Sequence, residues 1–313
     1  MNFETLLQTE RHILSAGSVY ELLRRSPEVV FDKHIFHAGL IYDAHFADVL
    51  AGVFRSYIDE AVSSGLSIVI GTATWRANKE RIHASVFSER TVNEDNVRFL
   101  NDIRNSYAGS PISILILGDI GPRSDAYKPD EALDTDSALK FHAYQIERLA
   151  SSNVDCLQAS TIPAVSEAMG IALAMAKTGL PYVISFVVDE SGCLLDGTRL
   201  AEAIARIDDA VGDDSARYAI NCVHPTILLR ALDKNPEVEG RIISFCGNTS
   251  DLSAAELDGM EELQTQDPGA FASVNKQLLD AHDIPIVGAC CGSNPDHIHE
   301  IAGFLKKQGV SRQ

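Results

Sequence analysis

The sequence predicts an α/β fold, a single-domain (β/α)8 TIM barrel of eight parallel strands. Eight short apolar segments recur along the chain, and most are separated by stretches with helical spacing of apolar residues. Near-continuous apolar runs are typical of parallel strands that are covered on both faces. Repeated strand–helix alternation favours a barrel, and an open doubly wound sheet is the alternative. No linker divides the 313 residues, so we expect one domain over 1–313.

The apolar segments give the expected strands. They cover residues 12–15, 67–72, 112–118, 156–159, 182–188, 218–222, 241–245 and 285–291. The fourth segment is the weakest, because it is short and contains a glutamine. In a TIM barrel the carboxyl ends of such strands carry the active site.

Helices are expected between the strands, where start and stop residues bound the apolar pattern. They cover residues 46–64, 137–150, 164–177, 199–211, 225–232 and 295–309. Gly65 and Gly179 are placed to end two of these helices, and Pro225 and Pro295 suit the first helical position of two others. Residues 20–43 exceed an ordinary loop, and we expect them to lie over the barrel mouth.

Composition excludes several classes of partner and compartment. The chain has 44 acidic and 26 basic residues, a net charge of −18, and no block of Lys or Arg. Nucleic acid and anionic membranes are therefore not expected as partners. No apolar run reaches about 18 residues and the start lacks a secretion signal, which indicates a cytoplasmic protein. The 6 cysteines then favour thiol or metal chemistry over a disulfide framework.

Three of these cysteines stand at the ends of two predicted strands. Cys222 closes the sixth strand, and Cys290 and Cys291 close the eighth. Three thiolates leave one position of a tetrahedral zinc free, which is how catalytic zinc sites are built. The alternative is that each cysteine is a small buried apolar residue. Cys246, after the seventh strand, would as a fourth ligand make the site structural.

These segments resemble the zinc-dependent homocysteine S-methyltransferase family. Residues 286–292 are similar to its Gly-Gly-Cys-Cys-Gly signature, and Asn221-Cys222 resembles its Val-Asn-Cys element. Weaker similarities occur at 72–78, 118–122, 161–168 and 185–198. Together they run from about residue 11 to residue 302 in the family's order.

The resemblance implies an enzyme of methionine biosynthesis that moves a methyl group from a sulfonium or quaternary ammonium donor to a thiol. Zinc would be the cofactor, held by Cys222, Cys290 and Cys291, and homocysteine or a related thiol would be the acceptor. Donors in the family include S-methylmethionine, S-adenosylmethionine and betaine. A monomer or small homo-oligomer is expected. Further substrate-binding candidates are Gly17, Ser18, Trp75, Ser160 and Asn221.

Two positions depart from the family. Ala16 and Ser160 stand where members generally carry the Asp and Glu that hold the ammonium of homocysteine. A different thiol, such as a mercapto acid, is then an alternative acceptor, with its carboxylate on the backbone amides after Gly17. Asp119 and Asp189 are the candidates to replace the missing acids.

Several alternatives remain open. Trp75 can face a methylated cation through its ring or serve only in packing. His297 and His299 fall on a helix face that we expect to be exposed to solvent, so neither is expected as a ligand. A noncatalytic zinc-binding or thiol-redox protein is the competing function, with Cys290 and Cys291 joined as a vicinal disulfide.

Overall fold

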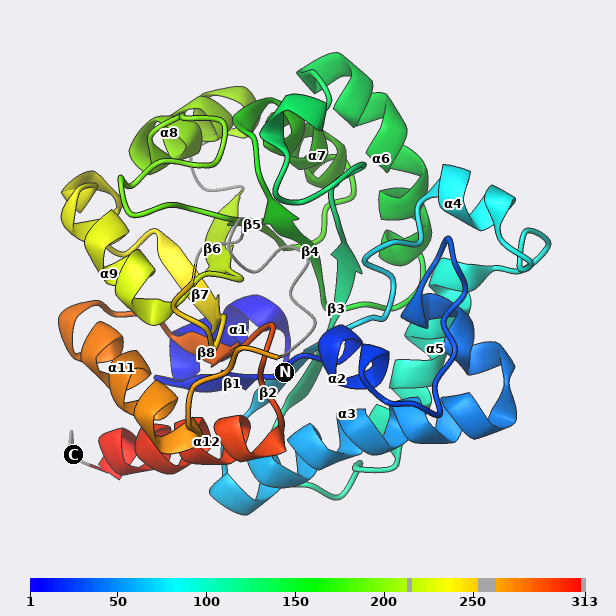
Figure 1. Cartoon of the computed structure of the whole chain (residues 1–313), viewed down its shortest axis with the longest axis horizontal. Coiled ribbons are helices and arrows are strands. Elements are labelled where there is room, and N and C mark those ends of the chain that lie inside the picture. Colours follow the sequence, from blue (N-terminus) through cyan, green and yellow to red (C-terminus); the bar gives the residue numbers. More distant parts are fainter. Residues whose placement is uncertain (213–215, 253–262, 311–313) are drawn as a thin grey trace.

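Eight parallel strands close into a barrel in chain order, and β8 pairs with β1 (Figure 1). The computed structural model describes residues 1–212, 216–252 and 263–310. The strands are β1 Ile13–Ser15, β2 Ile68–Gly71, β3 Ile114–Ile120, β4 Cys156–Ile162, β5 Tyr182–Phe186, β6 Arg217–Asn221, β7 Ile242–Gly247 and β8 Ile286–Ala289. The TIM barrel is therefore confirmed, and all eight strands lie where the apolar segments predict them. The fourth is three residues longer than expected and continues to Ile162.

The six predicted helices are present with ends within two residues of expectation. They are α3 Ala44–Ser64, α6 Thr135–Ala150, α7 Val165–Ala176, α8 Leu200–Val211, α9 Pro225–Asp233 and α12 Pro295–Val310. The sequence analysis missed α1 Phe3–Thr9, α2 Tyr20–Arg24, α4 Lys79–Ala84, α5 Val92–Asn105, α11 Pro268–Ala281, and the 3-10 helices η1 His37–Tyr42, η2 Pro129–Glu131 and η3 Pro236–Val238. One cause is visible in α5, where two buried asparagines interrupt the apolar stripe.

Local signals explain where the helices begin and end. The carboxylate of Asp43 accepts hydrogen bonds from the first backbone N–H groups of α3, which ends at Gly65 with a left-handed φ of 68°. Asp134 caps α6 in the same way. Pro225 begins α9, where its missing N–H group costs no hydrogen bond.

The interior of the barrel changes from apolar to polar along its axis. At the amino ends of the strands, inward side chains such as Val69 and Leu115 pack on α1, which closes that end through Phe3 and Leu6. Two residues further along several strands the inward position becomes polar, as in Leu117 and Asp119 of β3 or Val183 and Ser185 of β5. Because side chains alternate across a strand, this places the polar groups together at the carboxyl end.

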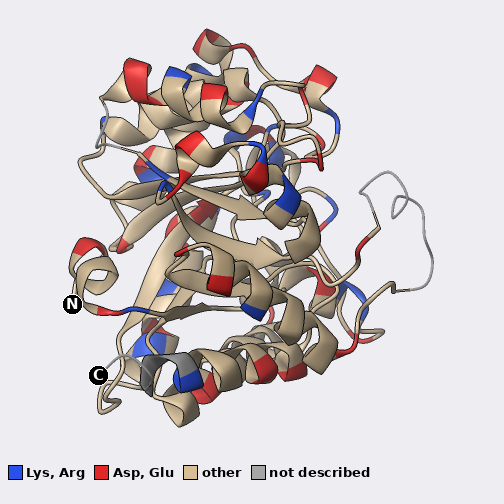
Figure 2. Ribbon diagram, turned by 90° about the vertical axis from the view of Figure 1, so that its left-hand side faces the viewer, with Lys and Arg blue, Asp and Glu red and all other residues tan. Residues whose placement is uncertain are grey.

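The outer layer of helices carries most of the surface charge. Figure 2 shows acidic and basic segments interspersed over the helices, while the strands are mostly uncharged. A second apolar core fills the space between strands and helices, with Phe54, Tyr57 and Phe245 among its buried members. None of the helices in the described ranges is long and apolar enough to cross a membrane.

Gly170 of α7 packs tightly against α6, so a larger residue there should destabilise the protein. A Cβ atom there would lie 2.5 Å from the Cβ of Ala138 and 2.5 Å from the carbonyl oxygen of Thr135. Gly170→Ala should therefore lower the free energy of unfolding by about 1–3 kcal/mol. Gly303→Ala is the matched control, because nothing lies within 4 Å of its added Cβ, and it should be neutral or stabilise by up to about 1 kcal/mol. Urea denaturation measures both; equal effects would contradict the packing explanation.

Candidate metal centre

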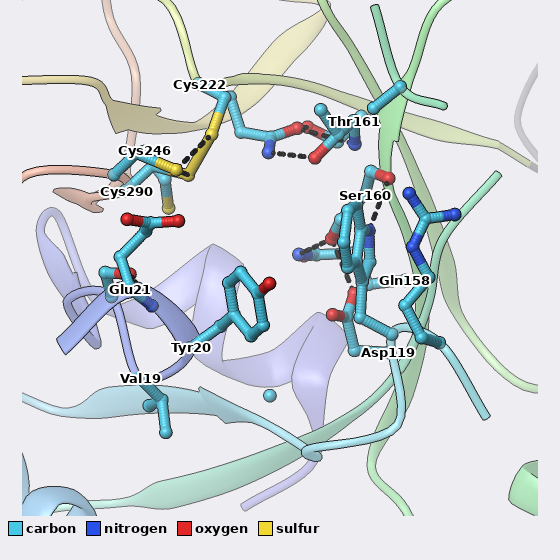
Figure 3. A pocket seen from close by; sticks show the side chains of 18 of the residues that line it. Val19, Tyr20, Glu21, Asp119, Gln158, Ser160, Thr161, Cys222, Cys246 and Cys290 are labelled. Carbon is cyan, nitrogen blue, oxygen red and sulfur yellow. Dashed lines mark hydrogen bonds between the residues drawn. A yellow bond between two sulfur atoms is a disulfide. The ribbon is translucent and has the colours of Figure 1, made fainter. Parts of the chain in front are cut away.

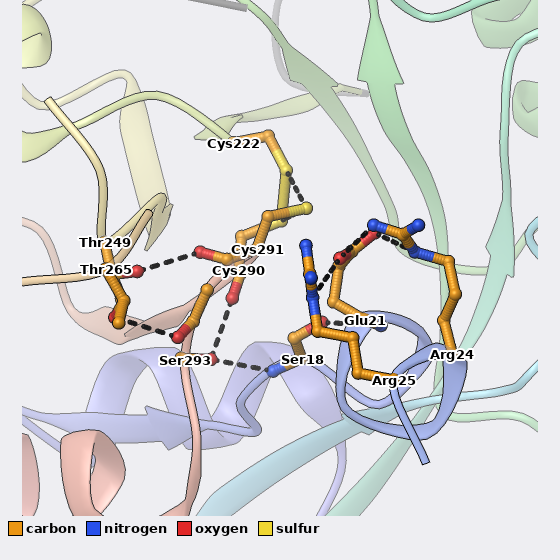
Figure 4. Close-up of polar contacts among 11 residues, drawn as sticks. Ser18, Glu21, Arg24, Arg25, Cys222, Thr249, Thr265, Cys290, Cys291 and Ser293 are labelled. Atoms are coloured by element: carbon orange, nitrogen blue, oxygen red, sulfur yellow. Dashed lines mark hydrogen bonds and ion pairs between the residues drawn. A yellow bond between two sulfur atoms is a disulfide. The ribbon is translucent and has the colours of Figure 1, made fainter. Parts of the chain in front are cut away.

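Cys222, Cys290 and Cys291 meet at the carboxyl end of the barrel (Figures 3 and 4). Their three Sγ atoms lie within 4.8 Å of one another. The Sγ atom of Cys291 is 3.4 Å from that of Cys222 and 3.9 Å from that of Cys290. Sulfurs on a tetrahedral zinc, at about 2.3 Å from the ion, are about 3.8 Å apart. The two non-bonded separations thus fit a shared zinc.

The third pair of sulfurs is joined as a disulfide between Cys222 and Cys290. The vicinal disulfide considered for the competing function is not formed, since Cys291 is a free thiol. A strand lies between the two bonded cysteines in the sheet, and the barrel brings their side chains together across it. All three sulfurs become available to one cation only when this disulfide is reduced.

Cys222 reaches the site through an unusual backbone conformation. It directly follows β6 and has a φ of 59°, in the left-handed region that side chains other than glycine rarely adopt. Its N–H group donates to the carbonyl oxygen of Cys246 at 3.0 Å. Such strain persists where surrounding contacts impose it, and it clusters at functional sites.

The turn that carries Cys290 and Cys291 is bonded to neighbouring loops (Figure 4). Cys290 N–H donates to the carbonyl oxygen of Gly247 at 2.6 Å, and Thr249 N–H donates to that of Cys291 at 3.1 Å. Ser293 Oγ donates to the carbonyl oxygen of Cys290 at 2.8 Å. Hydrogen bonds to the backbone and to a serine hydroxyl thus fix the turn that carries both cysteines.

Burial opposes ionisation of the free thiol. It raises the pKa of Cys291 to about 12, and the nearby carboxylate of Glu21 acts in the same direction. A cation beside the sulfur is what would make this group a thiolate at neutral pH.

A cavity of about 650 Å³ opens over the cysteines. The predicted site residues Gly17, Ser18, Trp75, Ser160 and Asn221 all line it. They come from the ends of β1, β2, β4 and β6, as expected for a barrel. In Figure 3, Tyr20 projects between the cysteines and the group formed by Asp119 and Ser160.

Asn221 is fully engaged with the protein. Its Oδ1 accepts from Thr161 N–H at 2.9 Å and from Ser185 Oγ at 2.6 Å, and its Nδ2 donates to Thr161 Oγ1 at 2.8 Å. Thr161 also has a left-handed φ, of 64°. The geometry therefore indicates that Asn221, which directly precedes Cys222, holds the end of β4 in place.

The turn after β1 is likewise occupied by internal contacts. Ser18 N–H donates to Ser293 Oγ at 3.0 Å, so this amide is not free for a substrate carboxylate as the sequence suggested. A Cβ on Gly17 would lie 2.8 Å from the hydroxyl oxygen of Tyr57. Glycine is needed here because that ring passes so close to the backbone.

Ser160 is bonded to one of the two candidate acids. Its Oγ donates to Asp119 Oδ1 at 2.5 Å and accepts from Gln158 Nε2 at 2.9 Å. Burial raises the pKa of Asp119 to about 7, although the Ser160 hydrogen bond opposes the rise. Asp189 is exposed, accepts from Ser191 and does not line the cavity, so it cannot replace a missing acid there.

The indole of Trp75 makes a hydrogen bond through its edge and contacts a guanidinium group through one face. Its Nε1 donates to the carbonyl oxygen of Ser160 at 3.2 Å. The guanidinium of Arg76 lies 4.0 Å from the centre of its ring, and the ring of Tyr20 is 6.4 Å away. Sequence reasoning missed both neighbours, because only the folded backbone shows that they line the same cavity.

The remaining candidates lie outside the sulfur group. Cys246 lines the cavity but donates to Ser15 Oγ at 3.3 Å and is not among the three clustered thiols. The expected exposure of His297 is wrong, because the residue is only 2% exposed and its Nε2 lies 3.0 Å from the carbonyl oxygen of Gln266. His299 is exposed, as expected, and its ring pairs with the carboxylate of Glu60.

Comparisons with known proteins agree with this architecture. A profile of the homocysteine S-methyltransferase family matches residues 4–305. Homocysteine S-methyltransferase YbgG of Bacillus subtilis is 24% identical over 202 residues, which are 61% of this chain and 62% of that protein. Homocysteine S-methyltransferase 2 of Saccharomyces cerevisiae is 27% identical over 183 residues, 54% of each chain. The chain thus spans less than two thirds of the length of these curated relatives.

The fold is also shared with a solved structure. The homocysteine methyltransferase MmuM from Escherichia coli, in its metallated form, superimposes with a TM-score of 0.75. The match covers 96% of this chain and 98% of that one, at 19% identity. At this identity the likeness concerns the fold alone.

Proposed function

The chain belongs to the homocysteine S-methyltransferase family, and from this premise we propose that it transfers a methyl group from a sulfonium or quaternary ammonium donor to a zinc-bound thiol. Residues 1–313 would act as one catalytic domain. The observation that carries the proposal is the group of three cysteine sulfurs within 4.8 Å. Three cysteines are the protein ligand set that leaves a zinc able to take a substrate.

Cys222, Cys290 and Cys291 would hold the metal. Bound there, zinc would lower the pKa of an added thiol so that its sulfur reacts as a thiolate. The chain's own residues fix where that reaction occurs. Thr249 and Ser293 hold the turn with the two adjacent cysteines, and Asn221 holds the end of β4 opposite it.

The aromatic wall of the cavity supports a cationic methyl donor. Tyr20, Phe36, Trp75 and Tyr127 line it, and the faces of such rings attract sulfonium and quaternary ammonium groups. One face of Trp75 is covered by Arg76, which makes the tyrosines the better candidates for the cation.

The experiment is a transfer assay on protein that has been reduced and loaded with zinc. S-methylmethionine, S-adenosylmethionine and betaine are each supplied with homocysteine or 4-mercaptobutyrate, and the methylated thioether is quantified. We expect product with at least one donor, and none after zinc is chelated. A protein that binds zinc and thiol but forms no thioether with any pair would refute the proposal.

The disulfide between Cys222 and Cys290 favours one competing function. In a noncatalytic zinc-binding or thiol-redox protein, the same thiols would exchange between a metal-bound and an oxidised form without moving a methyl group. The transfer assay separates the two functions, because only the methyltransferase forms a thioether.

A further inference from the structure

Two arginines on the cavity wall have no acidic partner. Arg76 is 7% exposed and Arg81 is half-buried, and both line the cavity. Within the described part of the chain, neither guanidinium forms an ion pair with a carboxylate. Arg76 Nη1 donates to the carbonyl oxygens of Pro122 at 3.0 Å and Ser124 at 2.5 Å, which carry no net charge. Its buried Nε has no hydrogen-bond partner among the described residues.

The acids of the same cavity do not neutralise these arginines. Glu21 pairs with Arg24 at 2.8 Å. Lys128 lies 3.7 Å from Asp125 and 4.0 Å from Glu131. The fourth acid is Asp119, whose pKa is raised to about 7 by burial, so that it is partly uncharged at neutral pH. Neither arginine is therefore in an ion pair among the described residues, although the charges of Asp125 and Glu167 act to raise the pKa of Arg76, and that of Glu80 acts to raise the pKa of Arg81.

Burial of the guanidinium charges of Arg76 and Arg81 is energetically unfavourable. Burial, the largest effect, lowers the pKa of Arg76 to about 10, and the positive charge of Arg81 acts in the same direction. A buried charge is normally paired or satisfied by a ligand, because leaving water without compensation is unfavourable. A bound anion would supply what the protein lacks.

A third unpartnered group belongs to the same wall. His37 is 5% exposed, lines the cavity, and its Nδ1 has no hydrogen-bond partner. Burial lowers its pKa to about 4, so it is neutral at pH 7. The ring of Tyr20 lies 5.4 Å from that of His37. Figure 3 shows Tyr20 projecting into the same pocket as Cys222 and Cys290.

We propose that Arg76 and Arg81, with His37 beside them, bind the carboxylate of a small sulfur substrate whose sulfur faces the cysteines. This inference rests on the proposed function and specifies its substrate class. The guanidinium groups of Arg76 and Arg81 would donate charge-assisted hydrogen bonds to the carboxylate oxygens. The backbone amide of Ser18 already donates to Ser293, so it does not compete for the carboxylate.

Two substrates could bring this carboxylate, namely an acid thiol acceptor or a sulfonium acid donor. Stable probes represent each source. The probe 4-(methylthio)butyrate stands for the methylated acceptor, and butyl methyl sulfide is its neutral counterpart. Dimethylsulfoniopropionate stands for the donor, with trimethylsulfonium as the counterpart that lacks a carboxylate.

Tryptophan fluorescence measures their binding without any turnover. The chain has 1 Trp, Trp75, and the Arg76 guanidinium is stacked on it. We expect at least one carboxylate probe to change the emission saturably and to bind about tenfold or more tightly than its counterpart. Binding of the thioether acid alone assigns the site to the acceptor, and binding of the sulfonium acid alone assigns it to the donor.

Variants test which groups hold the carboxylate. Arg76→Met should weaken binding of the carboxylate probe about tenfold or more without weakening binding of the counterpart that lacks the carboxylate. Arg81→Met should do the same, and it keeps the test valid if loss of the Arg76 bonds to Pro122 and Ser124 disturbs that loop. Arg98→Met is the matched control, because Arg98 is exposed, pairs with Asp95 and should leave binding unchanged.

Equal binding of the probes with and without a carboxylate, or unchanged carboxylate affinity in both variants, would overturn the inference. These binding measurements require no methyl transfer, so their result can be separated from that of the transfer assay. If the transfer assay fails while carboxylate binding persists, the subsite stands and the methyltransferase proposal falls. If transfer succeeds without selective carboxylate binding, only the subsite is rejected.

Discussion

Cys290→Ala is expected to lose most of its bound zinc and to reduce methyl transfer by more than about 100-fold. That factor is the upper range for residues that merely support a metal ligand, and removing a ligand should exceed it. The variant leaves two of the three clustered sulfurs, and the turn that carries them stays fixed by Gly247 and Thr249. Metal analysis of reduced, zinc-loaded protein gives the stoichiometry, which should be close to one zinc per chain in the unmodified protein.

Cys246→Ala is the matched control for this experiment. Cys246 is a thiol in the same cavity, but it bonds Ser15 and lies outside the sulfur group. It should retain the zinc. Both variants, and the chelated protein, should keep the circular dichroism of the unmodified chain, because the apolar cores form without metal. A full zinc equivalent in Cys290→Ala would show that the metal is held elsewhere.

L-homocysteine is expected to exceed 4-mercaptobutyrate, which lacks only the amine, by less than about tenfold in kcat/KM. The reason is that Ala16 and Ser160 offer no charge where family members are expected to carry two carboxylates. Each charge-assisted hydrogen bond to an ammonium is worth about 1.5–3 kcal/mol, so two would give about 100-fold or more. Of the two acids considered as replacements, only Asp119 lines the cavity. It already accepts a hydrogen bond from Ser160 and is partly protonated at neutral pH.

Restoring the two acids should raise the preference. The double variant Ala16→Asp with Ser160→Glu is expected to shift the ratio toward homocysteine by more than about tenfold. Asp119→Asn should remove any residual preference for homocysteine. A tenfold or greater preference in the unmodified enzyme would mean that the ammonium has a binding group other than these positions. No shift in the double variant would mean that the two positions do not face the amine.

The barrel and the cysteine group were predictable because they depend on local patterns and on topology. Uninterrupted apolar runs identify the strands, and parallel strands have their carboxyl ends on one face. Cys222 and Cys290 follow β6 and β8, which are separated by one strand in the closed sheet. Strand position alone therefore brings their side chains together.

Contacts that depend on side-chain direction were not predictable in the same way. Arg76 could have pointed to solvent, and only the folded loop shows it stacked on Trp75 and bonded to Pro122. His297 did carry a usable signal. It precedes Ile301 and Leu305 by four and eight residues, which places it on the buried face of α12.

The most direct test of the central claim is zinc X-ray absorption on the reduced, zinc-loaded protein before and after adding 4-mercaptobutyrate. We expect three sulfur neighbours from Cys222, Cys290 and Cys291, and a fourth when the thiol is present. Four sulfurs before the thiol is added would contradict the account by indicating a closed structural site. So would a sulfur count that the thiol leaves unchanged.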